Sequence, residues 1–166
     1  MTEVVTQAAK LVTEMSDRDI EVFYRRHRVR LRRPETRVLR HILITINDDI
    51  PDNRRNKAQG RIGAIRRILL DHPQRFAELA LEFSECPTAL NGGLLGSVRR
   101  GQLYAELEPV AFALEAGELS ALAESPMGLH LLRCDIIHVA RSLSLAEVTP
   151  FIRSHLTKLR EQARSR

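Results

Sequence analysis

The segment VLRHILITI at residues 38–46 constrains the fold most, because its β-branched and apolar residues are typical of a strand. A second strand is predicted at residues 129–138, and a brief one at residues 119–123. Alternation places Leu39, His41, Leu43 and Thr45 on one face of the first strand and Val38, Arg40, Ile42, Ile44 and Ile46 on the other. In the second strand His130, Leu132, Cys134 and Ile136 share a face.

The residues between these strands show helical periodicity. Amphipathic helices are predicted at residues 57–70, 76–83 and 107–114, and Gly117 is expected to cap the last of them. Residues 84–98 are rich in turn signals and are predicted to form a loop. Strands separated by unequal numbers of helices favour an α+β fold over a doubly wound sheet.

Both ends of the chain are predicted to be helical. Val5, Ala8, Val12 and Met15 follow helical spacing, and Asp17 is expected to cap a second helix that ends at Arg33-Pro34. A closing helix carries Leu145, Val148, Ile152, Leu156 and Leu159. We therefore expect helical segments at residues 1–33 and 140–166 around a domain at residues 34–139, with terminal helices able to form a groove or a homodimer surface.

The basic residues are unevenly distributed. Eight arginines and one acidic residue lie between Tyr24 and His41, in a chain whose net charge is +5. This stripe could bind phosphates or an acidic partner, or it could be a solvated helix face and connector. We favour the solvated face, and do not expect nucleic-acid binding, because no aromatic residues are interleaved for base stacking.

The two cysteines, Cys86 and Cys134, are expected to be free thiols in a reducing compartment. Their spacing lacks the Cys/His clusters of zinc sites, so no metal is expected. No apolar run approaches the roughly 20 residues that span a bilayer, and the N-terminus does not resemble a signal peptide. The predicted location is cytoplasmic, without membrane association.

Three stretches in order resemble the parvulin family of peptidyl-prolyl cis-trans isomerases. They are RPETRVLRHILI, FAELALEFSECPTALNGGLLGSVRRGQL and PVAFALEAGELSALAESPMGLHLLRCDII, and together they cover about residues 33–137. The resemblance implies an antiparallel four-stranded sheet surrounded by helices. It also implies isomerase activity on a proline-containing polypeptide, with no cofactor.

Two shorter strings, CPTALNGGLLG and ESPMGLHLLRCD, resemble the nitrogen-fixation branch of this family. Members of that branch assist maturation of the nitrogenase iron protein, which is therefore the expected client. They usually carry a larger helical region before the isomerase domain, whereas about 33 residues precede it here.

The resemblance also implies the site residues. His41 and His130 match the paired histidines of the parvulin active site, Cys86 its cysteine and Ser125 a hydroxyl residue near the histidines. Leu95, Leu103 and Leu107 match the walls of the proline pocket. Taken singly, each of these residues also fits an ordinary core or structural position, and Cys134 is interpreted as a small core residue.

Two residues depart from the family pattern. Leu107 stands where phenylalanine is common, and Met127 stands where serine is common. These changes keep the pocket apolar but remove an aromatic wall and a hydroxyl, so catalysis could be weaker or the substrate different. The alternative function is therefore a chaperone that binds a client without isomerising it.

Overall fold

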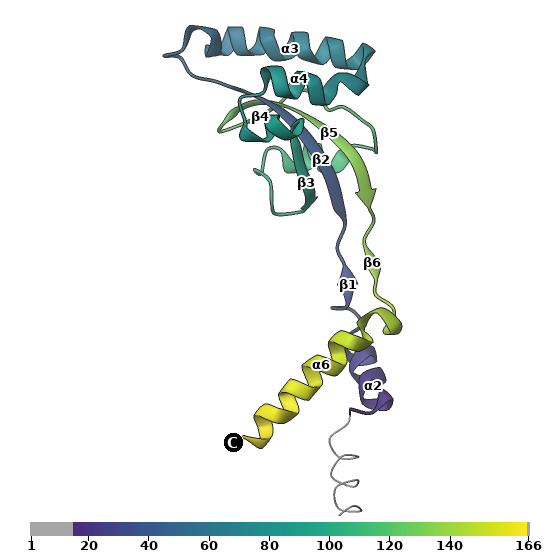
Figure 1. Cartoon of the computed structure of the whole chain (residues 1–166). Coiled ribbons are helices and arrows are strands. Elements are labelled where there is room, and N and C mark those ends of the chain that lie inside the picture. The colour runs from purple at the N-terminus through teal and green to yellow at the C-terminus, as the bar shows by residue number, and fades with distance from the viewer. Residues whose placement is uncertain (1–14, 166) are drawn as a thin grey trace, which may run out of the picture. The chain divides into compact units, whose positions relative to one another are not determined.

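The computed structural model describes residues 15–165, which fall into two compact units (Figure 1). The larger unit contains residues 34–139, and the smaller one contains the chain before Pro34 and after Val139. The helix predicted from Val5, Ala8 and Val12 lies outside the described residues. Within residues 15–165, no helix is both long and apolar enough to cross a membrane.

The larger unit is built on a four-stranded antiparallel sheet. Its strands follow the order β3-β2-β5-β4, with β2 at Thr36–Thr45, β3 at Leu94–Arg99, β4 at Ala123–Ser125 and β5 at Gly128–His138. The two long central strands, β2 and β5, pair along their whole shared length, from Thr36 opposite His138 to Thr45 opposite Gly128. The predicted α+β fold with an antiparallel four-stranded sheet is confirmed.

Two helices cover one face of this sheet. Figure 1 shows α3 (Arg55–Asp71) and α4 (Phe76–Phe83) lying together on the same side of the strands. Their buried side chains pack against Ile42, Ile44, Leu129 and Leu131. Because these strand residues alternate with His41 and His130, the histidines are directed to the opposite face.

The opposite face carries a second apolar cluster around the short helix α5 (Glu108–Ala113). Leu39, Leu132 and the fully buried Cys134 belong to this cluster, as expected for Cys134 as a core residue. Arg37 fixes the end of α5, because its guanidinium donates hydrogen bonds to the carbonyl oxygens of Leu114 and, at 3.3 Å, of Ala111.

The predicted loop at residues 84–98 was wrong in part, because it contains β3 and the 3₁₀ turn η3 (Pro87–Asn91). The strand is formed by pairing with β2, as shown by Thr36 opposite Arg99 and Leu39 opposite Gly96. The predicted strand at 119–123 is present only at its two ends, since Leu119 forms an isolated bridge with Arg133 and the ladder of β4 begins at Ala123. Gly117 does not cap α5, whose C-cap is Leu114.

The smaller unit contains helices α2 (Asp17–His27) and α6 (Leu145–Arg164), with two short strands that pair. These strands are β1 (Arg32–Arg33) and β6 (Arg141–Ser142). The predicted cap at Asp17 was wrong by one residue, because Ser16 caps α2 in a reciprocal pair with Asp19. The closing amphipathic helix is confirmed.

The predicted end of the second helix at Arg33-Pro34 was also wrong. The helix stops at His27, because Arg32 and Arg33 leave the helical path to pair with β6. Ile20, Val148 and Ile152 form the buried core between α2 and α6. Arg153 ties the helices further, since it donates to the Met15 carbonyl oxygen at 2.9 Å and pairs with Asp17 at 2.8 Å.

Candidate active site

A pocket of about 340 Å³ opens on the sheet face that carries α5. Seven side chains line it: His41, Leu95, Gln102, Leu103, Tyr104, Leu107 and His130. The structure therefore brings together both of the histidines and all three of the leucines that the sequence pointed to. Apolar carbon supplies most of the lining, with the imidazole rings as the polar elements from the sheet.

The two histidines meet because of the register between β2 and β5. His130 lies opposite Leu43 and His41 lies opposite Leu132, so the two histidines are diagonal neighbours on one face of adjacent strands. Their ring centroids are 5.5 Å apart, and the two Nδ1 atoms are 3.3 Å apart. A shift of one residue in this register would move one histidine to the opposite face of the sheet.

The histidine pair forms the centre of a chain of four side chains. The Nε2 atom of His41 lies 2.9 Å from Oγ1 of Thr88, and Nε2 of His130 lies 2.7 Å from Oγ of Ser125. One neutral ring must donate through Nδ1 and the other must accept, so the tautomers of the rings are coupled. If His41 donates to His130, then Thr88 donates to His41 and His130 donates to Ser125; the opposite polarity reverses every bond.

Burial keeps both histidines neutral. The side chains are almost completely shielded from solvent, and this desolvation lowers the pKa of His41 below its ordinary value. Burial also lowers the pKa of His130, to about 4, with a further contribution from the neighbouring His41. The pair is therefore uncharged at neutral pH and acts as a set of fixed hydrogen-bonding dipoles rather than as a cation.

The loop after α4 holds one end of this chain in place. Beyond Arg40 the edge of β2 is no longer paired with β3, and the loop satisfies its backbone groups instead. The His41 N–H donates to the Gly93 carbonyl oxygen at 2.8 Å, and the Leu43 N–H donates to Ser84 Oγ at 3.0 Å. These bonds anchor the loop on either side of Thr88, which is how Thr88 reaches His41.

Ser125 is placed at the other end by β4. It pairs with Gly128 across the tight turn between β4 and β5, and it is buried. The Met127 N–H donates to its oxygen at 3.1 Å, so the serine side chain is fixed by both the turn and His130. The side chain of Met127 is half exposed at this turn.

Cys86 takes a different place from the other predicted site residues. It is partly exposed and immediately precedes η3, two residues before Thr88. It is absent from the pocket lining, and within residues 15–165 its sulfur forms no hydrogen bond with either histidine. The structure thus brings the loop of Cys86 to the histidines through Thr88.

Sequence reasoning missed three residues of the site, namely Thr88, Gln102 and Tyr104. No local pattern marked Thr88, whose role depends on how the loop is anchored to β2. Tyr104 follows the predicted wall residue Leu103 directly, and an aromatic residue at that position was a usable signal. Tyr104 adds an aromatic ring to a pocket that has leucine at position 107.

No metal site is apparent in the part of the chain that the structure describes. Within residues 15–165, no three or more histidine, cysteine, aspartate or glutamate side chains gather as a ligand set. The nitrogen atoms of the histidine pair face each other and two hydroxyl groups, which accounts for all four ring nitrogens.

The sequence and fold match known proteins. The PpiC-type peptidyl-prolyl isomerase (rotamase) domain matches residues 41–135. Proteins named as the peptidyl-prolyl cis-trans isomerase NifM are 44% identical in Azotobacter chroococcum, over 92% of this chain, and 35% identical in Klebsiella pneumoniae, over 89%. The chain spans about half the length of these relatives, 52% and 53% respectively.

Two solved structures share the fold of this chain. A peptidyl-prolyl isomerase of Candida albicans is 27% identical, with a TM-score of 0.54 over 60% of this chain and 62% of its own. A SurA-like chaperone of Campylobacter jejuni shares the fold, with a TM-score of 0.68 at 20% identity, over 99% of this chain and 66% of its own. The chain therefore belongs to the PpiC-type peptidyl-prolyl isomerase family, the parvulins.

Proposed function

We propose that this protein is a peptidyl-prolyl cis-trans isomerase that acts on a polypeptide client. One observation carries the proposal: an apolar pocket lined by three leucines and Tyr104 has a neutral, buried histidine pair in its wall. A proline ring is compact and apolar, so such a pocket can hold the ring while the preceding peptide bond lies against the polar groups.

The isomerisation reaction requires little of the protein beyond binding the proline and its preceding peptide bond in this way. Rotation about a peptide bond is opposed by amide resonance, with a barrier of roughly 18–20 kcal/mol, and no covalent bond is broken. Catalysis therefore requires that the twisted amide be bound more tightly than either planar form. Burial of the proline ring removes water from the amide, and fixed dipoles then stabilise its altered charge.

In this mechanism the histidines orient and polarise the site and transfer no proton to the client. Thr88 and Ser125 at the two ends fix the imidazole rings at 2.9 and 2.7 Å, which keeps the chain of dipoles in place during rotation. The proposed role of Cys86 is to tune this network from the loop that carries Thr88. A covalent intermediate is unnecessary, because isomerisation exchanges two rotamers of one bond.

The client is proposed from the resemblance to the nitrogen-fixation branch. The similarity to NifM of two Azotobacter and two Klebsiella species supports the nitrogenase iron protein as the client. In this proposal residues 34–139 act as the isomerase domain, and the segments 1–33 and 140–166 serve interactions outside the pocket. The cytoplasmic location and the homodimer stay predictions.

Phosphorylated substrates are not favoured by the surroundings of the pocket. Arg54 and Arg55 follow β2, where a phosphate-binding arginine would be expected. Arg55 already forms a bidentate pair with Glu124, at 2.8 and 2.9 Å, and Glu124 directly precedes Ser125. Because this pair already occupies the Arg55 guanidinium, we do not expect this arginine to bind a phosphate on the residue before proline.

A second candidate function is client binding without isomerisation. The observation that favours it is Leu107, which is buried in the α5 cluster and replaces the aromatic wall common in the family. Tyr104 supports the first function instead, because its ring lines the same pocket.

The decisive experiment is NMR exchange spectroscopy on a panel of short X–Pro peptides. Leu103→Ala is the best pocket variant, since Leu103 lines the pocket and is only partly buried, so the fold should be retained. We expect it to slow exchange by about tenfold, because truncation removes apolar contact worth about 1–2 kcal/mol. His130→Ala should slow exchange as well.

The matched control is Leu81→Ala, which truncates an exposed leucine on α4 and should leave exchange unchanged. No acceleration of exchange on any peptide by the folded wild type would refute the isomerase proposal. Suppression of client aggregation to the same degree by the wild type and by Leu103→Ala would then establish client binding as the function.

A further inference from the structure

The smaller unit carries the positive charge of this protein. Its described residues, 15–33 and 140–165, contain twelve arginine and lysine residues against five aspartate and glutamate residues. The larger unit, residues 34–139, contains twelve against fourteen. The excess of positive charge is thus confined to the unit that does not contain the proline pocket. Binding of a separate partner there would explain why the charge is concentrated in this unit.

The same unit has a groove of about 440 Å³ along α2 and α6. One wall contains Met15, just before α2, and the α2 residues Arg18, Asp19, Val22, Phe23, Arg26 and His27, and the α6 wall contains Leu156, Leu159, Arg160 and Ala163. Both sets follow helical spacing, so each wall is one stripe of its helix. The groove lies entirely within the smaller unit.

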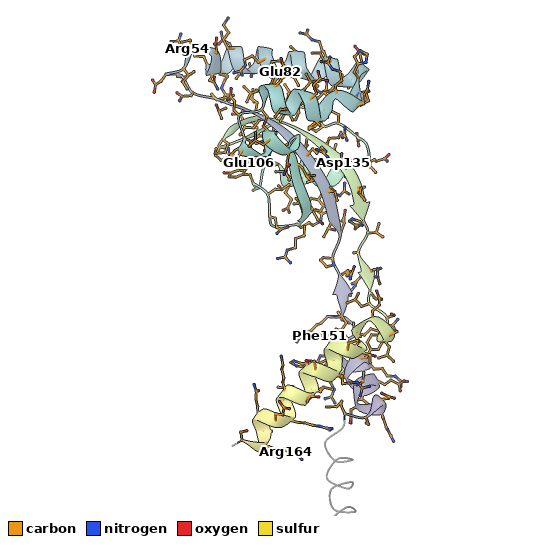
Figure 2. The ribbon with its side chains drawn as sticks, in the orientation of Figure 1. Arg54, Glu82, Glu106, Asp135, Phe151 and Arg164 are labelled. Atoms are coloured by element: carbon orange, nitrogen blue, oxygen red, sulfur yellow. The ribbon has the colours of Figure 1, made fainter. Side chains whose placement is uncertain are left out.

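The floor of the groove is apolar and accessible to solvent. Val22 is 53% exposed and Leu159 is 46% exposed, on the same two helices whose buried residues Ile20 and Ile152 form the core. A further apolar residue of α6, Phe151, is 64% exposed and is marked in Figure 2 near the start of that helix. Exposed apolar residues over a rigid core are typical of a binding groove rather than of a loosely packed end.

The rim of the groove is basic. Arg18, Val22 and Arg26 follow one another at intervals of four on α2, so two guanidinium groups flank the apolar floor. Among the described lining residues, the one carboxylate is that of Asp19, and it is already held by Arg160 at 3.2 Å and by Ser16. The groove therefore offers an apolar floor between positive charges.

We propose that this groove binds an acidic amphipathic helix of a partner polypeptide. The apolar face of such a helix would cover Val22, Phe23 and Leu159, and its carboxylates would lie against Arg18 and Arg26. Helices with apolar residues at intervals of three and four dock into grooves of this kind. A nucleic acid would satisfy the arginines but would leave the aliphatic floor uncovered. The inference is independent of the isomerase function, because none of these residues lines the proline pocket.

Fluorescence anisotropy with the full chain and a designed peptide tests this proposal. The probe is a labelled peptide of about 18 residues with leucine at helical spacing and glutamate elsewhere, and its twin has lysine in place of glutamate. We expect the wild type to bind the glutamate peptide and not the lysine peptide. Binding should weaken steeply with salt, since the ion pairs are exposed.

The critical variant is Arg18→Glu with Arg26→Glu. It should weaken binding of the glutamate peptide by about tenfold or more and create binding of the lysine peptide, because the apolar floor is unchanged. Val22→Asp should also weaken binding of the glutamate peptide, because it places a charge on the apolar floor. The matched control, Arg67→Glu with Arg99→Glu, reverses two exposed arginines of the larger unit and should bind like the wild type.

Three outcomes would overturn the proposal. The first is binding that does not depend on charge, seen either as equal affinity for the two peptides or as unchanged affinity in the variant with Arg18 and Arg26 reversed. The second is tighter binding of a random-sequence RNA or DNA duplex that displaces the peptide. The third is a dimer in sedimentation that Val22→Asp dissociates, which would make a second copy of this chain the occupant. Exchange of X–Pro peptides, measured on the same variants, should be unchanged, so loss of isomerase activity and loss of peptide binding are separable.

Discussion

Acidification should destabilise this fold through its buried histidine pair. His130 is only 2% exposed, and burial together with His41 lowers its pKa from 6.5 to about 4. The unfolded chain takes up this proton near pH 6.5, whereas the folded chain resists it until about pH 4. The unfolded state therefore binds more protons in this window, so the free energy of unfolding falls as the pH drops from about 6.5 to about 4.

The magnitude follows from the gap between the two pKa values. At about 1.4 kcal/mol per pK unit, His130 contributes about 3 kcal/mol above pH 6.5, nearly all of which is lost by about pH 4. Near pH 5 the loss should already be about 2 kcal/mol. His41 acts in the same direction, because burial lowers its pKa too. For a protein of this size, whose total stability is about 5–15 kcal/mol, the effect is large.

Urea unfolding followed by circular dichroism, at pH values between about 4 and 8, measures this dependence. His130→Gln removes the titrating group and should flatten the profile between about pH 6.5 and pH 4. The matched control is His72→Gln, at an exposed histidine after α3, which should keep the wild-type profile. If His130→Gln has the same slope as the wild type, His130 does not remain neutral in the folded state and the reasoning fails.

Three further substitutions test how the site is held together. Thr88→Val removes the hydroxyl that contacts His41 at 2.9 Å, so it should slow isomerisation with little change in KM and cost about 1 kcal/mol in urea unfolding; unchanged kinetics would exclude Thr88 from the network. Gly93→Ala places a Cβ against the carbonyl oxygen of His41 at a φ of 75°, and should cost about 2 kcal/mol or more, whereas Gly101→Ala, at a φ of 84° in open space, should cost about 1 kcal/mol. Equal losses of stability in the two glycine variants would contradict the close approach of Gly93 to the His41 carbonyl oxygen. Arg37→Met leaves the carbonyl groups at the end of α5 without their donor, and leaves Glu35 with only its 3.7 Å pair to Arg100, so it should lower the free energy of unfolding by about 3 kcal/mol, with partial rescue in Arg37→Lys; a loss below about 1 kcal/mol would mean that these contacts are replaceable.

The elements with their own periodicity could be predicted from the sequence. The helix predicted at 76–83 is present at Phe76–Phe83, and the strand predicted at 129–138 is present at Gly128–His138. In both segments the order of apolar and polar residues along the chain itself predicts the type of element. The missed strand, β3, contains Gly96 at a φ of 83° and follows two more glycines, so its local sequence favours a turn. Its extended form depends on pairing with β2.

The residues of the candidate site likewise divide into those that the sequence indicated and those that depend on tertiary contacts. The leucines of the pocket and the two histidines were named through the family resemblance, and the structure places all five around one pocket. Their proximity depends on the register between β2 and β5 and on the packing of α5, which no local pattern reveals. Thr88 was missed because its position results from backbone bonds between the loop and β2.

The central position of β2 also has a consequence for the order of folding. This strand, at residues 36–45, pairs with β3 at residues 94–99 and with β5 at residues 128–138, so its partners are separated from it by long stretches of chain. Closing such loops costs entropy before any contact is gained, which slows folding. During synthesis both edges of β2 are therefore expected to stay unpaired until most of the domain has left the ribosome. A domain of this topology is therefore itself expected to fold slowly.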